Sequence, residues 1–149
     1  MLMEINEVID NKKAYIELLL LADEQEDIID RYLDKGKMNV LDDNGIKCQC
    51  VLTNEGNGVH EIKNIAKVPE YQGKGYAKAM IDFIIMKYGE EYSTLQVGTG
   101  DSLSTIPFYE KCGFVCSHII PNFFTENYNH PIYEESIQLV DMVYLQRIL

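Results

Sequence analysis

The chain has 149 residues, a length that suits one ordinary domain with one hydrophobic core. Hydrophobic residues make up 46% and charged residues 25%, which is the balance of a folded globular protein and not of a disordered chain. Thirteen basic and twenty-four acidic side chains give a net charge of -11, which opposes nonspecific binding to nucleic acid or to anionic lipid. We therefore expect a single domain over residues 1–149, with neither nucleic acid nor a membrane as a partner.

The cysteines do not predict a metal site. Cys48, Cys50, Cys112 and Cys116 lack the spacing of zinc ligands and have no suitably placed histidines beside them, so we expect four reduced thiols and no metal. No apolar run is long enough to cross a bilayer, and the first residues lack the basic-then-apolar order of a secretory signal. The expected location is the cytoplasm.

Apolar periodicity and turn residues divide the first part of the chain into short elements. In chain order these are a strand at residues 4–9, helices at 12–22 and 26–34, and strands at 38–41, 47–53 and 60–68. Asn11 is placed to cap the first helix and Gly36 to stop the second. The run Asp42-Asp43-Asn44-Gly45 is a strong hairpin turn between two of the strands.

The second part of the chain also alternates between predicted helices and strands. It predicts a helix at residues 75–88, a strand at 93–97, a shorter helix that ends at Cys112, a strand at 114–120 and a closing strand at 142–148. Gly98-Thr99-Gly100-Asp101 is expected to turn, and Gly113 to cap the shorter helix. Pro107 would cost a helix interior one hydrogen bond, so this helix is expected to begin near Ser104 or to kink.

A glycine-bearing segment joins the strand at 60–68 to the helix at 75–88: Val68-Pro69-Glu70-Tyr71-Gln72-Gly73-Lys74-Gly75-Tyr76-Ala77. Glycines let the backbone turn with exposed N–H groups, and the helix adds its positive end, so the segment favours an anion such as a pyrophosphate. Lys74 and Lys78 could add positive charge. The nucleoside-triphosphate pattern fails because Gly75 follows Lys74, and the dinucleotide fingerprint fails because Lys78 stands where it needs a glycine.

The pattern that remains, Gln-x-x-Gly-x-Ala over residues 72–77, resembles the coenzyme A-binding motif of the GCN5-related N-acetyltransferases. Downstream, Phe108-Tyr109-Glu110-Lys111-Cys112-Gly113-Phe114 resembles the second signature of that family, a helix that carries a tyrosine and ends at Gly-Phe. The resemblance covers residues 60–120 well. It implies a mixed α/β (α+β) fold with a central, mostly antiparallel sheet, flanking helices and a splayed parallel strand pair, here residues 60–68 and 93–97.

The resemblance also implies acetyl-coenzyme A as co-substrate, without a metal. Backbone groups of Ile65 and Lys67 would hold the pantetheine arm, and an amide near Ile65 could polarise the acetyl carbonyl. The pyrophosphate would lie against the amides of Gln72, Gly73, Lys74, Gly75, Tyr76 and Ala77. This chain departs from the family at Ser102, where an asparagine often contacts the coenzyme.

Two side chains are candidates for proton transfer. Glu61 stands where some members of the family carry a general base, and the alternative is an exposed strand carboxylate. Tyr109 stands where the family usually places a hydroxyl that protonates the departing thiolate, and the alternative is a ring that only packs. A covalent route through Cys112 lacks a local histidine to activate the thiol.

The expected reaction is direct transfer of an acetyl group from acetyl-coenzyme A to a primary amine of a small molecule or peptide. Alternatives are a sensor or scaffold module without transfer activity and an enzyme that uses a longer acyl group, and a homodimer is left open as the oligomeric state. The aromatic segment 123–134 is expected to form part of the acceptor site or to pack its own rings at the surface.

Overall fold

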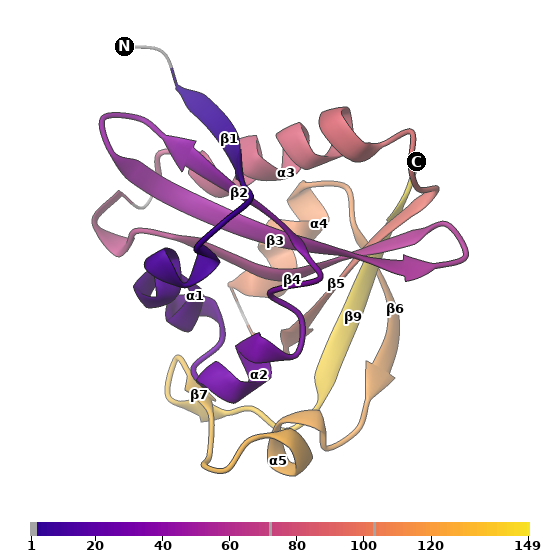
Figure 1. The fold of residues 1–149 in the computed structure, drawn as a ribbon. Helices are drawn as coiled ribbons and strands as arrows, with labels where there is room; N and C mark the ends of the chain where they lie inside the picture. Colours follow the sequence, from indigo (N-terminus) through magenta and orange to yellow (C-terminus); the bar gives the residue numbers. More distant parts are fainter. Residues whose placement is uncertain (1–2, 72, 103) are drawn as a thin grey trace. The chain divides into compact units, whose positions relative to one another are not determined.

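The computed structural model describes residues 3–71, 73–102 and 104–149. The chain divides into two compact units, residues 1–93 and 94–149 (Figure 1). No helix in the described ranges is long and apolar enough to cross a membrane.

The first unit contains four antiparallel strands, paired in the order β1-β2-β3-β4. Its elements are β1 (Glu4–Val8), the 3₁₀ helix η1 (Lys12–Tyr15), α1 (Ile16–Ala22), α2 (Glu26–Asp30), β2 (Lys37–Asp42), β3 (Ile46–Gly56), β4 (Val59–Lys67), the 3₁₀ helix η2 (Pro69–Tyr71) and α3 (Tyr76–Tyr88). Each strand predicted in this part of the chain is confirmed, and so are the hairpin turn between β2 and β3 and the long helix.

One face of these strands is covered by α1 and α2. Leu19 of α1 and Ile29 of α2 belong to one buried cluster with Met38, Val40 and Val51 from β2 and β3. The spacing of these residues explains the cluster, because side chains two apart on a strand point to the same face.

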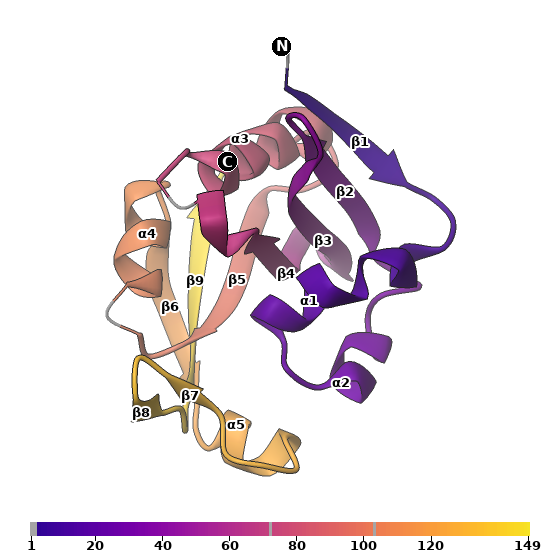
Figure 2. The same ribbon diagram turned by 90° about the vertical axis from the view of Figure 1, so that its left-hand side faces the viewer.

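The opposite face is covered by α3 (Figure 2). Asn39 alternates with the core residues of β2 and therefore points away from α1. Its Nδ2 atom donates a hydrogen bond of 3.0 Å to the hydroxyl of Tyr88, the last residue of α3. A polar contact thus fixes the end of this helix on the sheet.

Three details of the predicted helices are wrong. Asn11 adopts a left-handed conformation with φ 57° and makes no side-chain cap, and the chain first forms the 3₁₀ turn η1 before α1 begins. The second α-helix ends at Asp30 instead of residue 34, and turns follow it. Gly36 is needed for space and not as a stop, because a Cβ there would lie 2.6 Å from the Cγ1 atom of Val51.

A β-bulge interrupts β4. Asn64 pairs with Val51 of β3, whereas Ile62 pairs with Leu52, so that Lys63 is an extra residue in this strand. The bulge reverses the alternation of side chains between its two ends, which explains why this stretch shows poor periodicity in the sequence.

The second unit is built around β9, which pairs antiparallel with β5 on one side and β6 on the other. Its elements are β5 (Thr94–Gly100), α4 (Thr105–Lys111), β6 (Val115–Ile120), α5 (Phe123–Asn127), the short hairpin of β7 (Tyr133–Glu134) and β8 (Ile137–Gln138), and β9 (Met142–Ile148). The predicted strands and the shorter helix are confirmed. α4 starts directly after Ser104, and Pro107 is its third residue, where a missing N–H costs no helix hydrogen bond.

The turn predicted at residues 98–101 is wrong, because β5 continues to Gly100. The glycines serve close packing instead. A Cβ on Gly98 would lie 2.5 Å from the sulfur of Met142, and one on Gly100 would lie 2.6 Å from Cδ1 of Leu139. A side chain at either of these two points of the strand would force Met142 or Leu139 to move.

Candidate active site

The glycine loop leads into α3 with an open backbone. Gly73 and Gly75 both have φ of 76°, a conformation that side chains with a Cβ rarely adopt, and Gly75 is the N-cap residue of the helix. A Cβ on either glycine would meet nothing within 4 Å. The predicted contact Gln72 lies outside the described residues.

The first turn of α3 offers hydrogen-bond donors to an anion. The amides of Tyr76, Ala77 and Lys78 are the first of this thirteen-residue helix, and such amides have no carbonyl partner within their own helix. Lys74 is exposed in the turn. The ammonium of Lys78 lies 2.9 Å from the carboxylate of Asp82, so an intrahelical ion pair already uses part of its charge. Amides without a carbonyl partner in their own helix, a positive helix end and empty space beside the glycines fit a pyrophosphate.

The predicted pantetheine strand is β4. Ile65 pairs with Cys50 and Lys67 with Cys48, so both side chains lie on the same face of the sheet as these cysteines. Burial raises the pKa of the Cys48 thiol to about 12, against a smaller lowering by Lys67, and burial also raises the pKa of the Cys50 thiol. Both thiols therefore stay protonated at neutral pH and are poor nucleophiles.

Glu61 is buried on the other face of β4. Its side chain pairs in register with Thr53, which alternates with the core residue Val51, so the carboxylate lies on the side of α1 and α2. Glu61 is 5% exposed, and one carboxylate oxygen lies 3.0 Å from the ammonium of Lys63, the extra residue of the bulge. The alternative of an exposed strand carboxylate is therefore wrong.

A buried series of hydrogen bonds, which the sequence did not predict, lies on the same face of the sheet as Glu61. Asn64 donates through Nδ2 to the Leu19 carbonyl and to the Tyr32 hydroxyl, each over 3.0 Å. The Tyr32 hydroxyl in turn donates to Asp23 over 3.0 Å. Burial and the neighbouring Asp23 carboxylate raise the pKa of the Tyr32 phenol, so it remains a donor. Only the three-dimensional fold brings these distant positions together.

In the second unit, the end of α4 fixes Tyr109. The amide of Phe114 donates to the Tyr109 carbonyl and the amide of Gly113 donates to the Glu110 carbonyl, each over 3.0 Å. These two bonds, with Gly113 at φ 92°, form a Schellman motif. The Tyr109 and Phe114 rings meet edge to face with centroids 5.6 Å apart, and Tyr109 is 5% exposed. The Gly-Phe pair of the sequence motif thus has a physical role, which is to hold the tyrosine.

Ser102 lies just before the same helix, three residues ahead of Thr105. Its Oγ atom accepts hydrogen bonds from the amides of Ser104 and Thr105, each over 3.3 Å. Nearby, the Ser104 hydroxyl donates to Glu135 over 2.6 Å and so links α4 to the turn between β7 and β8. The Ser102 hydroxyl therefore already stabilises the start of α4, whether or not it also contacts a coenzyme.

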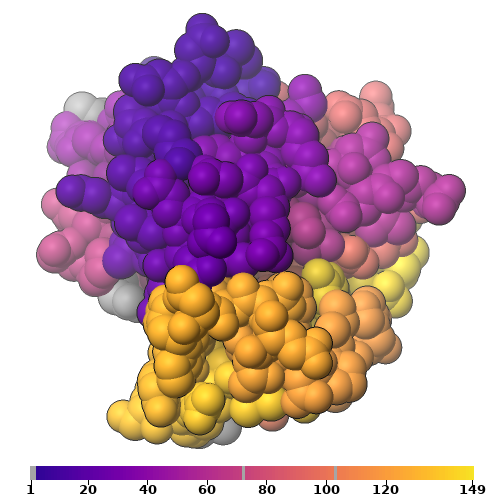
Figure 3. All heavy atoms as spheres, turned by 60° about the horizontal axis from the view of Figure 1, so that its bottom comes forward, coloured from indigo at the N-terminus to yellow at the C-terminus, as the bar shows by residue number. Residues whose placement is uncertain are grey.

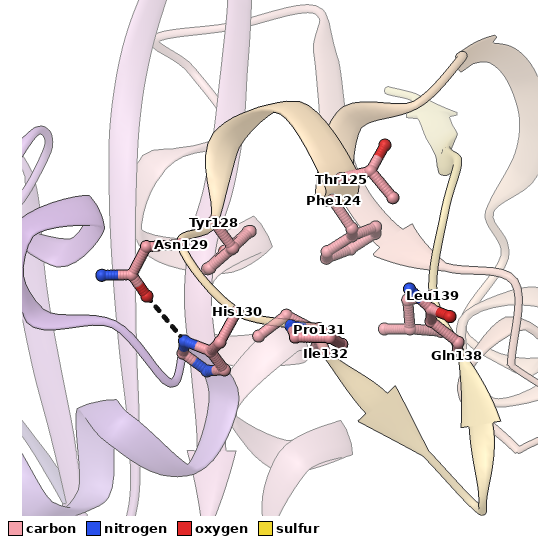
Figure 4. A pocket seen from close by; sticks show the side chains of 9 residues that line it. All are labelled: Phe124, Thr125, Tyr128, Asn129, His130, Pro131, Ile132, Gln138 and Leu139. Atoms are coloured by element: carbon pink, nitrogen blue, oxygen red, sulfur yellow. Dashed lines mark hydrogen bonds between the residues drawn. The ribbon is translucent and has the colours of Figure 1, made fainter.

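The aromatic segment after β6 forms a recess of about 230 Å³ (Figure 4). Phe124, Ile132 and Leu139 form a small buried cluster beneath it, and the Tyr128 ring stacks on Phe124 with centroids 5.7 Å apart. The recess is lined by Phe124, Thr125, Tyr128, Asn129, His130, Pro131, Ile132, Gln138 and Leu139. In Figure 3 the segment, coloured orange to yellow, covers an exposed face of its unit.

Comparison with known proteins identifies the family. The family model described as an acetyltransferase (GNAT) domain matches residues 34–116, more than half of the chain. A protein of Bacillus subtilis (strain 168), named Uncharacterized N-acetyltransferase YvbK, is 36% identical over 138 residues, which cover 91% of this chain and 88% of that protein. The chain belongs to the GNAT family of acetyltransferases.

Solved structures agree. A GNAT family acetyltransferase from Elizabethkingia anophelis with acetyl-CoA bound is 33% identical and has a TM-score of 0.93 over 99% of this chain and 98% of its own. A Bacillus subtilis acetyltransferase in complex with CoA is also 33% identical, with a TM-score of 0.90 over 99% of both chains. The expected mixed α+β fold and the expected acetyl-CoA-dependent N-acetyltransferase are confirmed.

Proposed function

We propose that this acetyltransferase moves the acetyl group directly from acetyl-CoA to a primary amine of a small molecule or peptide. The observation that carries the proposal is the open glycine turn at the start of α3, where the first helical amides lack a carbonyl partner in their helix and fit a pyrophosphate. Free cysteines suit a reducing compartment, and the proposal places the reaction in the cytoplasm.

The proposed chemistry needs one proton acceptor and one donor. The amine nitrogen attacks the acetyl carbonyl, the C–N bond forms and the C–S bond breaks with its electron pair going to sulfur. Glu61, directly or through a water, takes the proton that the amine loses, and the Tyr109 hydroxyl gives a proton to the thiolate. The amide near Ile65 donates a hydrogen bond to the carbonyl oxygen as negative charge develops there.

The function is tested by incubating the protein with acetyl-CoA and a panel of primary amines and measuring release of free coenzyme thiol. Propionyl-CoA and longer acyl donors in parallel assays define the acyl preference. Thiol release that depends on an amine supports the enzyme. Coenzyme binding without release from any donor would instead support a sensor or scaffold module.

For the acceptor, we propose that residues 123–134 wall the amine side of the site. The recess supports this because it combines aromatic walls with polar groups from Asn129 and His130, whose side chains are joined by a 2.7 Å hydrogen bond. Such a surface suits a ligand with an apolar part beside its amine.

Tyr128→Ala tests the acceptor proposal, because it removes one aromatic wall of the recess. We expect a changed order of preference among amines, with coenzyme affinity unchanged. Ile119→Ala is a control, since that side chain is exposed, at 58%, and lies outside both the segment and the recess. An amine profile of Tyr128→Ala identical to that of the wild type would refute this role of the loop.

A further inference from the structure

We infer that Asp43 and Lys47 of the β2–β3 hairpin are positioning residues for the coenzyme, acting through Tyr76 and Tyr71 on the two sides of the glycine loop. This inference rests on the proposed use of that loop for the pyrophosphate. The hairpin itself does not contact the coenzyme in this arrangement.

The C-terminal side of the loop is tied to the hairpin by a hydrogen bond. The hydroxyl of Tyr76, the first residue of α3, donates to the Oδ2 atom of Asp43 over 2.7 Å (Figure 1 shows the hairpin and the helix). Tyr76 is 8% exposed, and the hydrogen bond raises the pKa of its phenol, so that it donates at neutral pH. The start of the helix is thereby fixed to the tip of the hairpin.

The N-terminal side of the loop is tied by a cation and a ring. The ammonium of Lys47 lies 4.4 Å from the centroid of the Tyr71 ring and donates to the Asn44 carbonyl over 2.9 Å. The Lys47 carbonyl also accepts the amide of Val68 over 2.9 Å, which extends the pairing of β3 and β4 up to η2. Lys47 is 7% exposed, so its charge is held in place and is not a mobile surface charge.

The two tyrosines that the hairpin holds also contact each other. The rings of Tyr71 and Tyr76 approach edge to face, with centroids 6.4 Å apart. Between them, Gly73, Lys74 and Gly75 are exposed, and the two glycines have empty space where a side chain would be. Three exposed residues, two of them glycine, have little packing to order them, so the order of the loop depends on its anchored flanks.

Preorganisation of this kind favours binding because the ordering cost is met during folding and not when the coenzyme binds. The hairpin supplies it through one part-buried hydrogen bond, from Tyr76 to Asp43, and one contact of the Lys47 ammonium with the Tyr71 ring. Loss of either tie should therefore weaken coenzyme binding while leaving the chemical step intact once coenzyme is bound.

A double-mutant cycle of Asp43→Ala and Tyr76→Phe tests the hydrogen-bonded tie, with acetyl-CoA affinity measured by titration calorimetry. We expect each variant to bind roughly tenfold more weakly, as for one lost hydrogen bond, and the double variant to bind no more weakly than either. The KM for acetyl-CoA should rise and kcat should hold. Asp43→Asn, which keeps an acceptor oxygen, should restore affinity, and Asp34→Ala controls for the lost charge.

A second arm tests Lys47. Lys47→Met should raise the Kd for acetyl-CoA without changing its dependence on salt, whereas removal of a direct phosphate contact would make that dependence weaker. Lys47→Arg keeps the cation over the ring and should bind as the wild type does.

Three results would overturn the inference: wild-type affinity in both Asp43→Ala and Tyr76→Phe, additive losses in the double variant, or a changed salt dependence in Lys47→Met. The proposed function fails separately. If the wild type binds no acetyl-CoA, both ideas fall, but if it binds and the hairpin variants bind equally well, only the positioning role falls.

Discussion

Tyr109 is held by its own helix end, through two Schellman hydrogen bonds and the Phe114 ring. Removal of the hydroxyl alone leaves these constraints in place, so Tyr109→Phe isolates the acid from the packing. We expect kcat to fall by roughly a hundredfold, as for a lost general acid, with the Kd for acetyl-CoA unchanged. Single-turnover kinetics and calorimetry measure the two quantities.

Phe108→Leu is a suitable control for this experiment, because Phe108 touches the Tyr109 ring edge to face but carries no proton donor. It should cost stability and little activity. Full activity of Tyr109→Phe at every pH would show that the ring only packs and that another group or water protonates the thiolate.

The proposed role of Glu61 as proton acceptor can be tested by one substitution. The carboxylate is buried, and one of its oxygens lies 3.0 Å from the Lys63 ammonium. Glu61→Gln should slow transfer most at low pH, where the amine is protonated, and the rate should recover as pH rises and the amine arrives neutral. A pH profile of kcat/KM for the amine measures this.

The exposed residue Glu90 offers a control of equal charge. Glu90→Gln should leave the pH profile unchanged. If Glu61→Gln reduced activity by the same factor at all pH values, Glu61 would have a structural role with its Lys63 partner and would not be the base.

At the scale of elements, the glycine loop and α3 carry the strongest prediction. Gly75→Val fills the empty space where the pyrophosphate would approach and strains a residue at φ 76°. Gly56→Val is matched to it, because Gly56 has φ 85° and also nothing within 4 Å of a Cβ. Both variants should lose similar stability, but only Gly75→Val should lose acetyl-CoA affinity, by tenfold or more by calorimetry. Equal affinities would place the coenzyme elsewhere.

Several helices and turns of this protein could be predicted from the sequence alone. Local signals predicted α3, the hairpin turn of β2 and β3, and the Gly113 cap of α4, because these depend on residues near one another in the chain. Long-range packing decided the rest. The glycines of β5 read as a turn, yet they make room for Met142 and Leu139 from later in the chain.

The residues of the candidate site also fall into a group that sequence motifs predict and a group that they do not. The loop around Gly75 and the helix of Tyr109 were recognisable as motifs. The contacts of Asp43 and Lys47 were not, since nothing in the hairpin sequence shows that these side chains reach Tyr76 and Tyr71, which lie 33 and 24 positions later.

Coenzyme binding should raise the free energy of unfolding of the whole protein. A ligand that binds only the folded state at a hundred times its Kd adds about 2.7 kcal/mol, which for a chain of this size raises Tm by roughly 5–10 °C. Differential scanning fluorimetry with acetyl-CoA measures this. Gly75→Val should show a much smaller rise, and an equal rise in that variant would contradict the assigned site.

The bulge at Lys63 decides which side chains from the two ends of β4 share a face of the sheet. Glu61 and Asn64 are three positions apart, yet they share a face of the sheet, because the extra residue Lys63 takes up one step of the alternation. Deleting Lys63 would leave the two residues two apart in a regular strand, so Glu61 would keep its face and lose only the ammonium beside it. Deletion of Lys63 would thus remove the ion pair without moving the glutamate to the other face. A single misplaced gap in an alignment of this strand would assign the glutamate to the wrong column in a relative.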